Sequence, residues 1–158
     1  MRFGMIFIFT MLIIFGCQSQ DSKQSLFQND TTYHAEAAEK LGADEYGMKK
    51  YVMAFLKSGH NRSQDSTEAA RLQKAHLENI SRMAKEGKLV LAGPFMDDGD
   101  IRGIYIFNVS TLEEAQALTE TDPAIQSGRL VMELHPWYAS ATLPLLYNLH
   151  KQIAAKSF

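Results

Sequence analysis

The sequence has few of the residues on which several common protein classes depend. Its single cysteine excludes an intramolecular disulfide framework and a cysteine-based zinc cluster. Lys and Arg number 16 against 18 Asp and Glu, and this net charge of −2 argues against a nucleic-acid partner. Four prolines and ten glycines among 158 residues exclude a repetitive linker protein.

Motifs for cofactor binding are also missing. The five histidines show no H-x-x-x-H, H-x-H or H-E-x-x-H spacing, so no metal site is predicted. There is no P-loop, dinucleotide fingerprint or serine nucleophile elbow. We therefore predict no cofactor. The content of 46% hydrophobic and 22% charged residues is typical of a globular protein with room for one ordinary domain.

The N-terminal region differs in composition from the rest. After Arg2, residues 3–16 form an apolar run that is shorter than the roughly 20 residues of a transmembrane helix. The run stops at Cys17, and Ile14-Phe15-Gly16-Cys17 resembles a bacterial lipobox. We expect residues 1–16 to be a lipoprotein signal peptide and Cys17 to carry a lipid. The chain would then be anchored in the bacterial cell envelope, on the periplasmic or outer-membrane side. The alternative is a plain secretory signal with an incidental cysteine.

The next segment is polar. Residues 17–45 are rich in Gln, Ser, Asp and Thr and show no sustained hydrophobic period. Such a segment buries too little apolar area to offset its ordering entropy. We expect a flexible tether, in which part of 33–41 is able to form a short helix.

Residues 46–158 read as one α+β domain. The alternating and β-branched segments 48–57, 88–95, 101–109 and 129–138 predict four strands. Capping boxes at Asp65/Glu68 and Ser110/Glu113 predict helices over 66–86 and 111–120, and Asp122-Pro123 predicts a short helical turn that Gly128 ends. A last amphipathic helix is expected from Thr142 to about Lys156.

The order β-α-β-β-α-β fits a ferredoxin-like split βαβ fold with a C-terminal helix. Its helices cover one face of the sheet, so the other face needs a cover. Packing of sheet on sheet in a homodimer is the simplest cover for a domain of this size.

Two residues are the main candidates for chemistry. His76 lies on the apolar stripe of helix 66–86, and histidine acts as acid or base near neutral pH. A core histidine with one satisfied hydrogen bond is the alternative, and helix geometry alone favours it. Asp122 precedes Pro123, which is typical of a helix N-cap. A carboxylate near an imidazole orients the ring, but spacing alone does not show that the two residues meet.

Four further residues are candidates for ligand binding. Gly93 and Pro94 end a strand, where the backbone is able to approach a ligand closely; the alternative is a simple turn. Lys57 and Arg62 flank the loop after the first strand and are candidates for anion binding, although most such cations are solvated.

The run from about Tyr51 to Trp137 resembles the YCII-related (YciI-like) domain family. The most specific features are A-H-L in the first helix, G-K-L-x-x-A-G-P in the second strand and D-P-x-x-x-x-G before the last strand. The resemblance implies a dimeric ferredoxin-like α/β barrel with a histidine and an aspartate in a cleft. The matching residues here are His76 and Asp122. The family is related to muconolactone-isomerase-like proteins and includes a domain linked to dehydrochlorination of a chlorinated hydroquinone.

Two classes of function follow. In the first, His76 and Asp122 transfer protons on a small cyclic or aromatic molecule, as a lyase or isomerase. In the second, the domain is a non-catalytic small-molecule-binding or dimeric structural module of the cell envelope. Many members of the resembled family have no known reaction, so the resemblance implies a site and not a substrate.

Overall fold

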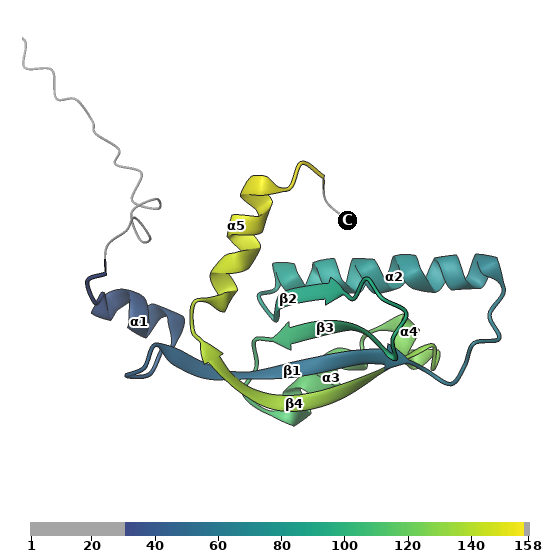
Figure 1. Cartoon of the computed structure of the whole chain (residues 1–158), viewed down its shortest axis with the longest axis horizontal. Helices are drawn as coiled ribbons and strands as arrows, with labels where there is room; N and C mark the ends of the chain where they lie inside the picture. Colours follow the sequence, from purple (N-terminus) through teal and green to yellow (C-terminus); the bar gives the residue numbers. More distant parts are fainter. Residues whose placement is uncertain (1–30, 157–158) are drawn as a thin grey trace, which may run out of the picture. The chain divides into compact units, whose positions relative to one another are not determined.

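The structure is a computed structural model that describes residues 31–156, and contacts within the chain group His34–Phe158 into one compact unit. The expected signal peptide and Cys17 lie outside the described residues. Along the chain the elements are α1 (Ala35–Leu41), β1 (Met48–Ser58), α2 (Ser66–Lys85), β2 (Leu89–Pro94), β3 (Ile101–Phe107), α3 (Leu112–Thr119), α4 (Pro123–Gln126), β4 (Leu130–Ser140), a 3₁₀ turn η2 (Leu143–Leu145) and α5 (Leu146–Ile153) (Figure 1).

The four strands form one antiparallel sheet in the order β2-β3-β1-β4. The long strands β1 and β4 pair over eleven residues, and β1 also pairs with β3. This strand order with two βαβ halves is the ferredoxin-like arrangement, so the predicted fold class is confirmed. In Figure 1, α3 lies behind β1 and β4, on the side away from the viewer.

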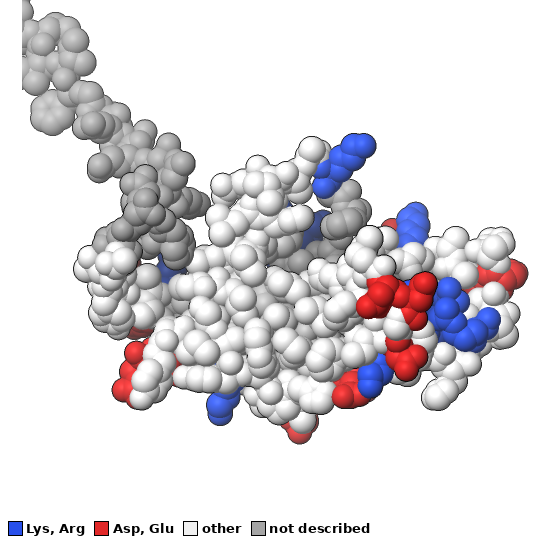
Figure 2. Space-filling view, viewed as in Figure 1, with Lys and Arg blue, Asp and Glu red and all other residues white. Residues whose placement is uncertain are grey.

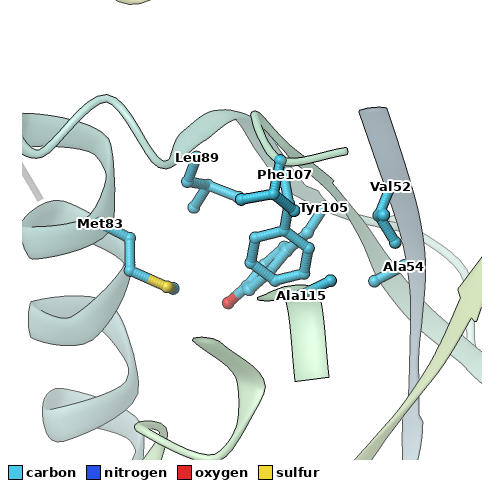
Figure 3. Close-up of a cluster of buried hydrophobic side chains, with 8 residues drawn as sticks. Val52, Ala54, Met83, Leu89, Tyr105, Phe107 and Ala115 are labelled. Carbon is cyan, nitrogen blue, oxygen red and sulfur yellow. The ribbon is translucent and has the colours of Figure 1, made fainter. Parts of the chain in front are cut away.

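The two faces of the sheet carry different side chains because successive residues of a strand point to opposite sides. On the helix-covered face, Val52 and Ala54 of β1 lie opposite Phe107 and Tyr105 of β3, and these side chains pack with Met83 of α2 (Figure 3). The opposite face carries a smaller buried cluster: Tyr51, Val90, Ile106 and Ala139. Much of the apolar core therefore lies directly under α2, the helix that carries the candidate histidine.

The helix caps follow the predicted chemistry with two differences. Asp65 accepts from the backbone N–H of Glu68 at 2.8 Å, but the Glu68 carboxylate pairs with Arg71 and does not complete a capping box. The second capping box uses Thr111 and Glu114 instead of Ser110 and Glu113. The sequence Ser-Thr-Leu-Glu-Glu contains two overlapping box patterns, and the helix begins at the second.

Two segments differ from the expectations at the ends of the domain. The polar segment is ordered earlier than residue 46, because α1 occupies the expected short-helix region and the Asp44 carboxylate accepts from the Met48 backbone at 3.0 Å. The last helix is shorter than expected, since a 3₁₀ turn containing Pro144 precedes α5, which ends at Ile153. Within residues 31–156, no helix is long and apolar enough to span a bilayer.

Alkaline pH is predicted to destabilise the fold through Tyr51. Burial raises the pKa of Tyr51 to about 12, whereas an exposed tyrosine titrates near ~10. Its stabilising contribution is complete below pH ~10 and is lost as pH rises through the folded pKa, because the unfolded chain releases the phenolic proton first. Urea unfolding at pH 8 and 11 should show this loss, and Tyr51→Phe should show less of it. An equal loss in both proteins would contradict the assignment.

Candidate active site

His76 is held on the buried stripe of α2. Its neighbours on that stripe are Leu72, Asn79 and Met83, and His76 itself is 6% exposed. Ile80, which follows His76 by four residues, is only partly buried, whereas Asn79 is buried. The histidine therefore faces the sheet across the core, as the periodicity predicted.

Asp122 performs two tasks with its two carboxylate oxygens. Oδ1 accepts a hydrogen bond from the Ala124 backbone N–H at 2.9 Å and caps α4, while Oδ2 lies 2.6 Å from His76 Nδ1. The residue is completely buried. Pro123 begins α4, and Gly128 follows it with a φ of +70°, a conformation that favours glycine. Asp122 therefore both caps α4 and contacts His76, and the helix cap fixes the carboxylate against the histidine.

The second ring nitrogen of His76 faces Tyr105, which the sequence analysis missed. The Tyr105 hydroxyl lies 3.2 Å from Nε2, and the two rings stack at 21° with centroids 6.2 Å apart. Burial, and to a lesser extent the Asp122 charge, raise the pKa of Tyr105. The phenol therefore keeps its proton and is the hydrogen-bond donor to Nε2. The only sequence signal was the place of Tyr105 on the core-facing side of β3.

These contacts assign the protons of the site. In the tautomer with its proton on Nδ1, His76 donates to Asp122 Oδ2, and its Nε2 accepts from the Tyr105 hydroxyl. The neighbouring carboxylate stabilises the ring when it becomes an imidazolium. The resulting chain Asp122–His76–Tyr105 can hold a proton at Nε2 and release it again, which is the chemistry of a general acid–base group.

A second polar group joins α2 to the loop that carries Asp122. Asn79 Oδ1 accepts from Arg82 Nη2 at 2.8 Å and lies 3.2 Å from the hydroxyl of Thr121, the residue before Asp122. Arg82 also donates to the Thr121 hydroxyl at 2.9 Å. These side chains clamp the loop onto α2 one helical turn from His76, and they were not predicted.

The four predicted ligand-binding residues do not join this chain of contacts. Lys57 pairs with Glu133, whose other oxygen lies 2.8 Å from His135 Nε2. By strand alternation Lys57 lies on the sheet face opposite to His76. Arg62 donates to the Arg129 carbonyl at 3.3 Å.

Gly93 and Pro94 end β2, where they pair with Ile104 and Gly103 of β3. A Cβ added at Gly93 would meet no atom within 4 Å, whereas one at Gly103 would lie 2.6 Å from the Gly93 carbonyl oxygen. Tight packing of β2 on β3 therefore requires glycine at 103. The backbone at Gly93 contacts the neighbouring strand.

Neither of two surface cavities is lined by His76, Asp122 or Tyr105. One of about 410 Å³ lies beside α5, with Lys85, Asn108 and Tyr147 in its lining. The other, of about 590 Å³, is lined in part by Asp44 and Tyr138. Over the described part of the chain, no cluster of three His, Cys, Asp or Glu side chains is arranged to hold a metal ion.

Residues 52–138 match the model of the YCII-related domain. The chain belongs to the YCII-related domain family. The match runs from β1 to β4 and includes both His76 and Asp122. The uncharacterized protein YjpA of Bacillus subtilis (strain 168) is 32% identical over 62 residues, which are 39% of this chain and 71% of that protein.

A solved structure with a similar fold is also known. It is 5-chloro-2-hydroxyhydroquinone dehydrochlorinase (TftG) from Burkholderia phenoliruptrix AC1100, in complex with 2,5-dihydroxybenzoquinone. It is 18% identical, with a TM-score of 0.42, over 56% of this chain and 93% of that chain. A likeness this distant does not transfer an activity to the YCII-related domain described here.

Removing the Asp122 side chain should destabilise the domain more than removing an exposed cap. Asp122→Ala leaves a buried histidine without its partner and uncaps α4, for a loss of about 3–5 kcal/mol. Asp65→Ala removes only the cap of α2, for a loss of about 1 kcal/mol. Asp122→Asn should fall between the two, because asparagine is still a good cap. Urea unfolding of the three variants measures the order, and equal losses at both aspartates would contradict the coupling.

Proposed function

We propose that the YCII-related domain is an acid–base enzyme of the lyase or isomerase type that acts on a small cyclic or aromatic molecule. The observation that carries the proposal is the buried pair in which Asp122 Oδ2 lies 2.6 Å from His76 Nδ1. His76 is the general acid–base residue, and Asp122 orients its ring.

The burial of this pair supports a functional role over a purely structural one. Taking a carboxylate and an imidazole out of water costs desolvation energy that their attraction only partly offsets. Well-packed apolar side chains would stabilise the same contact between α2 and α4 at least as well. Titratable groups that are buried together with a charge partner are concentrated at functional sites.

The proposed reaction uses Nε2, since Nδ1 is held by Asp122. Tyr105 first releases Nε2, and the nitrogen then takes a proton from a carbon next to a carbonyl group of the substrate. The C–H electrons pass into an enolate, and Asp122 stabilises the imidazolium. An isomerase returns the proton to a different carbon. A lyase instead expels an anion from the adjacent carbon, and the proton leaves His76 for solvent.

The surroundings of His76 support a small, largely apolar substrate. Leu72 and Met83 flank it on α2, and the Tyr105 ring packs edge-on against Phe107 with centroids 5.7 Å apart. A ligand that opens this junction would meet these apolar side chains, which favour a planar ring over a charged or extended molecule.

A non-catalytic binding or structural role is the second candidate. The observation that favours it is the closed state of the site, because both nitrogens of His76 are satisfied within the chain and neither cavity reaches it. This candidate predicts that His76→Ala lowers the stability of the domain and that the wild-type protein has no activity in any proton-transfer assay.

Proton exchange in D₂O tests the enzyme proposal without knowledge of the product. The full chain is incubated with cyclohexanone and cyclohex-2-enone, whose C–H groups next to the carbonyl exchange slowly at neutral pH without a catalyst, and NMR follows exchange of C–H for C–D. His76→Ala should remove enzyme-dependent exchange, and Asp122→Asn should reduce it by about 10²–10⁴-fold. His135→Ala alters an exposed histidine and should change nothing. Undiminished exchange in His76→Ala would contradict the role of this residue.

We propose that the open face of the sheet is covered by a second copy of the chain. This face carries Met53, Phe55, Ile104 and Trp137, and Val131 on it is 39% exposed. In Figure 2 the surface over the middle of the strands is uncharged, and charged side chains gather at the right-hand end of the view. A broad apolar face on a small domain is typical of an interface.

Phe55→Lys should therefore convert a dimer to a monomer, because it replaces a large apolar side chain of this face with a charged one. Analytical ultracentrifugation of the full chain in a mild detergent measures the mass, and Lys74→Glu on the exposed side of α2 is the control. A monomeric wild-type protein would contradict the proposal.

We further propose that Cys17 carries a lipid that anchors the domain in the bacterial cell envelope, on the periplasmic or outer-membrane side. The apolar run before Cys17 and the lipobox-like Ile14-Phe15-Gly16-Cys17 support this. Cys17→Ser should abolish incorporation of labelled palmitate and move the protein from the membrane fraction to the soluble fraction. Equal labelling of both proteins would contradict lipidation.

A further inference from the structure

One hydrogen-bonding atom in the buried polar layer between α2 and the Asp122 loop has no partner. Asn79 is 7% exposed, and its Nδ2 amide is the single buried side-chain nitrogen or oxygen without a hydrogen-bond partner among residues 31–156. A buried donor left unpaired is unfavourable, and native proteins seldom keep one without a reason. The fold therefore retains a free donor at a defined place.

The orientation of this amide is fixed by its neighbours. Asn79 Oδ1 accepts from the Arg82 guanidinium at 2.8 Å, a contact that only the oxygen can make. A flipped amide would set its N–H groups against those of Arg82. Nδ2 must consequently point away from Arg82, and the guanidinium charge on the oxygen side polarises the amide and strengthens the donor.

The free donor lies beside the acid–base chain. Asn79 follows His76 by three residues on α2, so the two side chains share the buried face as neighbours. Its oxygen lies 3.2 Å from the hydroxyl of Thr121, which directly precedes Asp122. The donor therefore belongs to the same helix–loop junction as His76 and Asp122.

We propose that Asn79 Nδ2 donates a hydrogen bond to an oxygen of the ligand that His76 serves, and that this ligand carries a carbonyl, enolate or phenolate oxygen. The proposal rests on the proposed function and names the oxygen-binding group of that site. A polarised donor suits an oxygen that gains negative charge when a neighbouring carbon loses its proton. Asn79 thereby becomes a determinant of which small molecules the site accepts.

The choice of variants separates ligand binding from folding. Asn79→Asp keeps the oxygen that Arg82 binds but replaces the free donor with an acceptor. Asn79→Ser also removes the amide donor and has a smaller side chain. It replaces Asn79→Asp in the experiment if the aspartate variant does not fold. Gln73→Glu adds the same charge as Asn79→Asp on the exposed side of α2 and is the matched control. Urea unfolding establishes that each variant is folded.

The experiment is an NMR titration of the full chain with cyclohexane-1,3-dione, 4-methylcatechol and 2,5-dihydroxybenzoquinone. The signals observed are the His76 ring and the Asn79 side-chain amide. The proposal predicts that a compound which shifts the His76 signals also shifts the Asn79 amide. It also predicts that Asn79→Asp weakens the affinity about tenfold or more, as loss of one charge-assisted hydrogen bond does, while Gln73→Glu binds normally.

Two results would overturn the proposal, and they differ in what they say about the site. If a compound shifts the His76 signals, leaves the Asn79 amide unchanged and binds Asn79→Asp equally well, the site is real but Asn79 is not its oxygen donor. A long-lived water detected on Nδ2 in that case identifies the structural partner of the amide. If no compound shifts either set of signals, the proposed function and the role of Asn79 fail together.

Discussion

The contact between His76 Nδ1 and Asp122 Oδ2 is the interaction on which the organisation of the helical layer depends. It joins the middle of α2 to the start of α4, two elements that are 46 residues apart in the chain. The same aspartate caps α4, and Gly128 then turns the chain into β4. Because both carboxylate oxygens are used, the short helix cannot shift without breaking the pair. The histidine is therefore held in one orientation by a structural element, as a general acid–base group requires.

The two faces of the sheet have different proposed roles, proton transfer on one and dimer formation on the other. The face under α2 combines the apolar cluster around Tyr105 and Phe107 with the polar chain that ends at Asp122. The exclusion of water strengthens each hydrogen bond of that chain and makes any unpaired polar group there destabilising. Asn79 Nδ2 is the exception, and it lies where a ligand oxygen would be useful. The other face carries the exposed group Lys57–Glu133–His135 beside apolar side chains, and we propose that a second copy covers it.

The fold could be predicted from the sequence because its local signals agree with one another. Alternation located the four strands, and Asp65 and Gly128 marked helix boundaries that the structure retains. The errors occur where one signal has two solutions, as in the overlapping capping boxes at Ser110 and Thr111, or where a proline interrupts an apolar pattern before α5. These ambiguities are settled by tertiary contacts that no local pattern contains.

The site was less accessible from the sequence. His76 and Asp122 were identified as a pair through the family resemblance, since their spacing alone favoured a core histidine and a cap. Tyr105 was missed because its contact with His76 depends on the register of β3 against β1 and on the placement of α2 above both. Asn79 was missed because the feature that marks it is an unpaired Nδ2 donor, which is visible only when the hydrogen bonds of the folded domain are known. Such features arise only from the assembled fold.

The most direct test of the account is ¹⁵N NMR of the His76 ring in the full chain at neutral pH, with and without Asp122→Asn. The account predicts a proton on Nδ1 that is protected from exchange with water, and an Nε2 signal that reports the Tyr105 hydrogen bond. In Asp122→Asn the protection of the Nδ1 proton should be lost while the fold remains. An Nδ1 proton that exchanges freely in the wild-type protein, or a spectrum unchanged by the substitution, would show that Asp122 does not hold His76 for proton transfer.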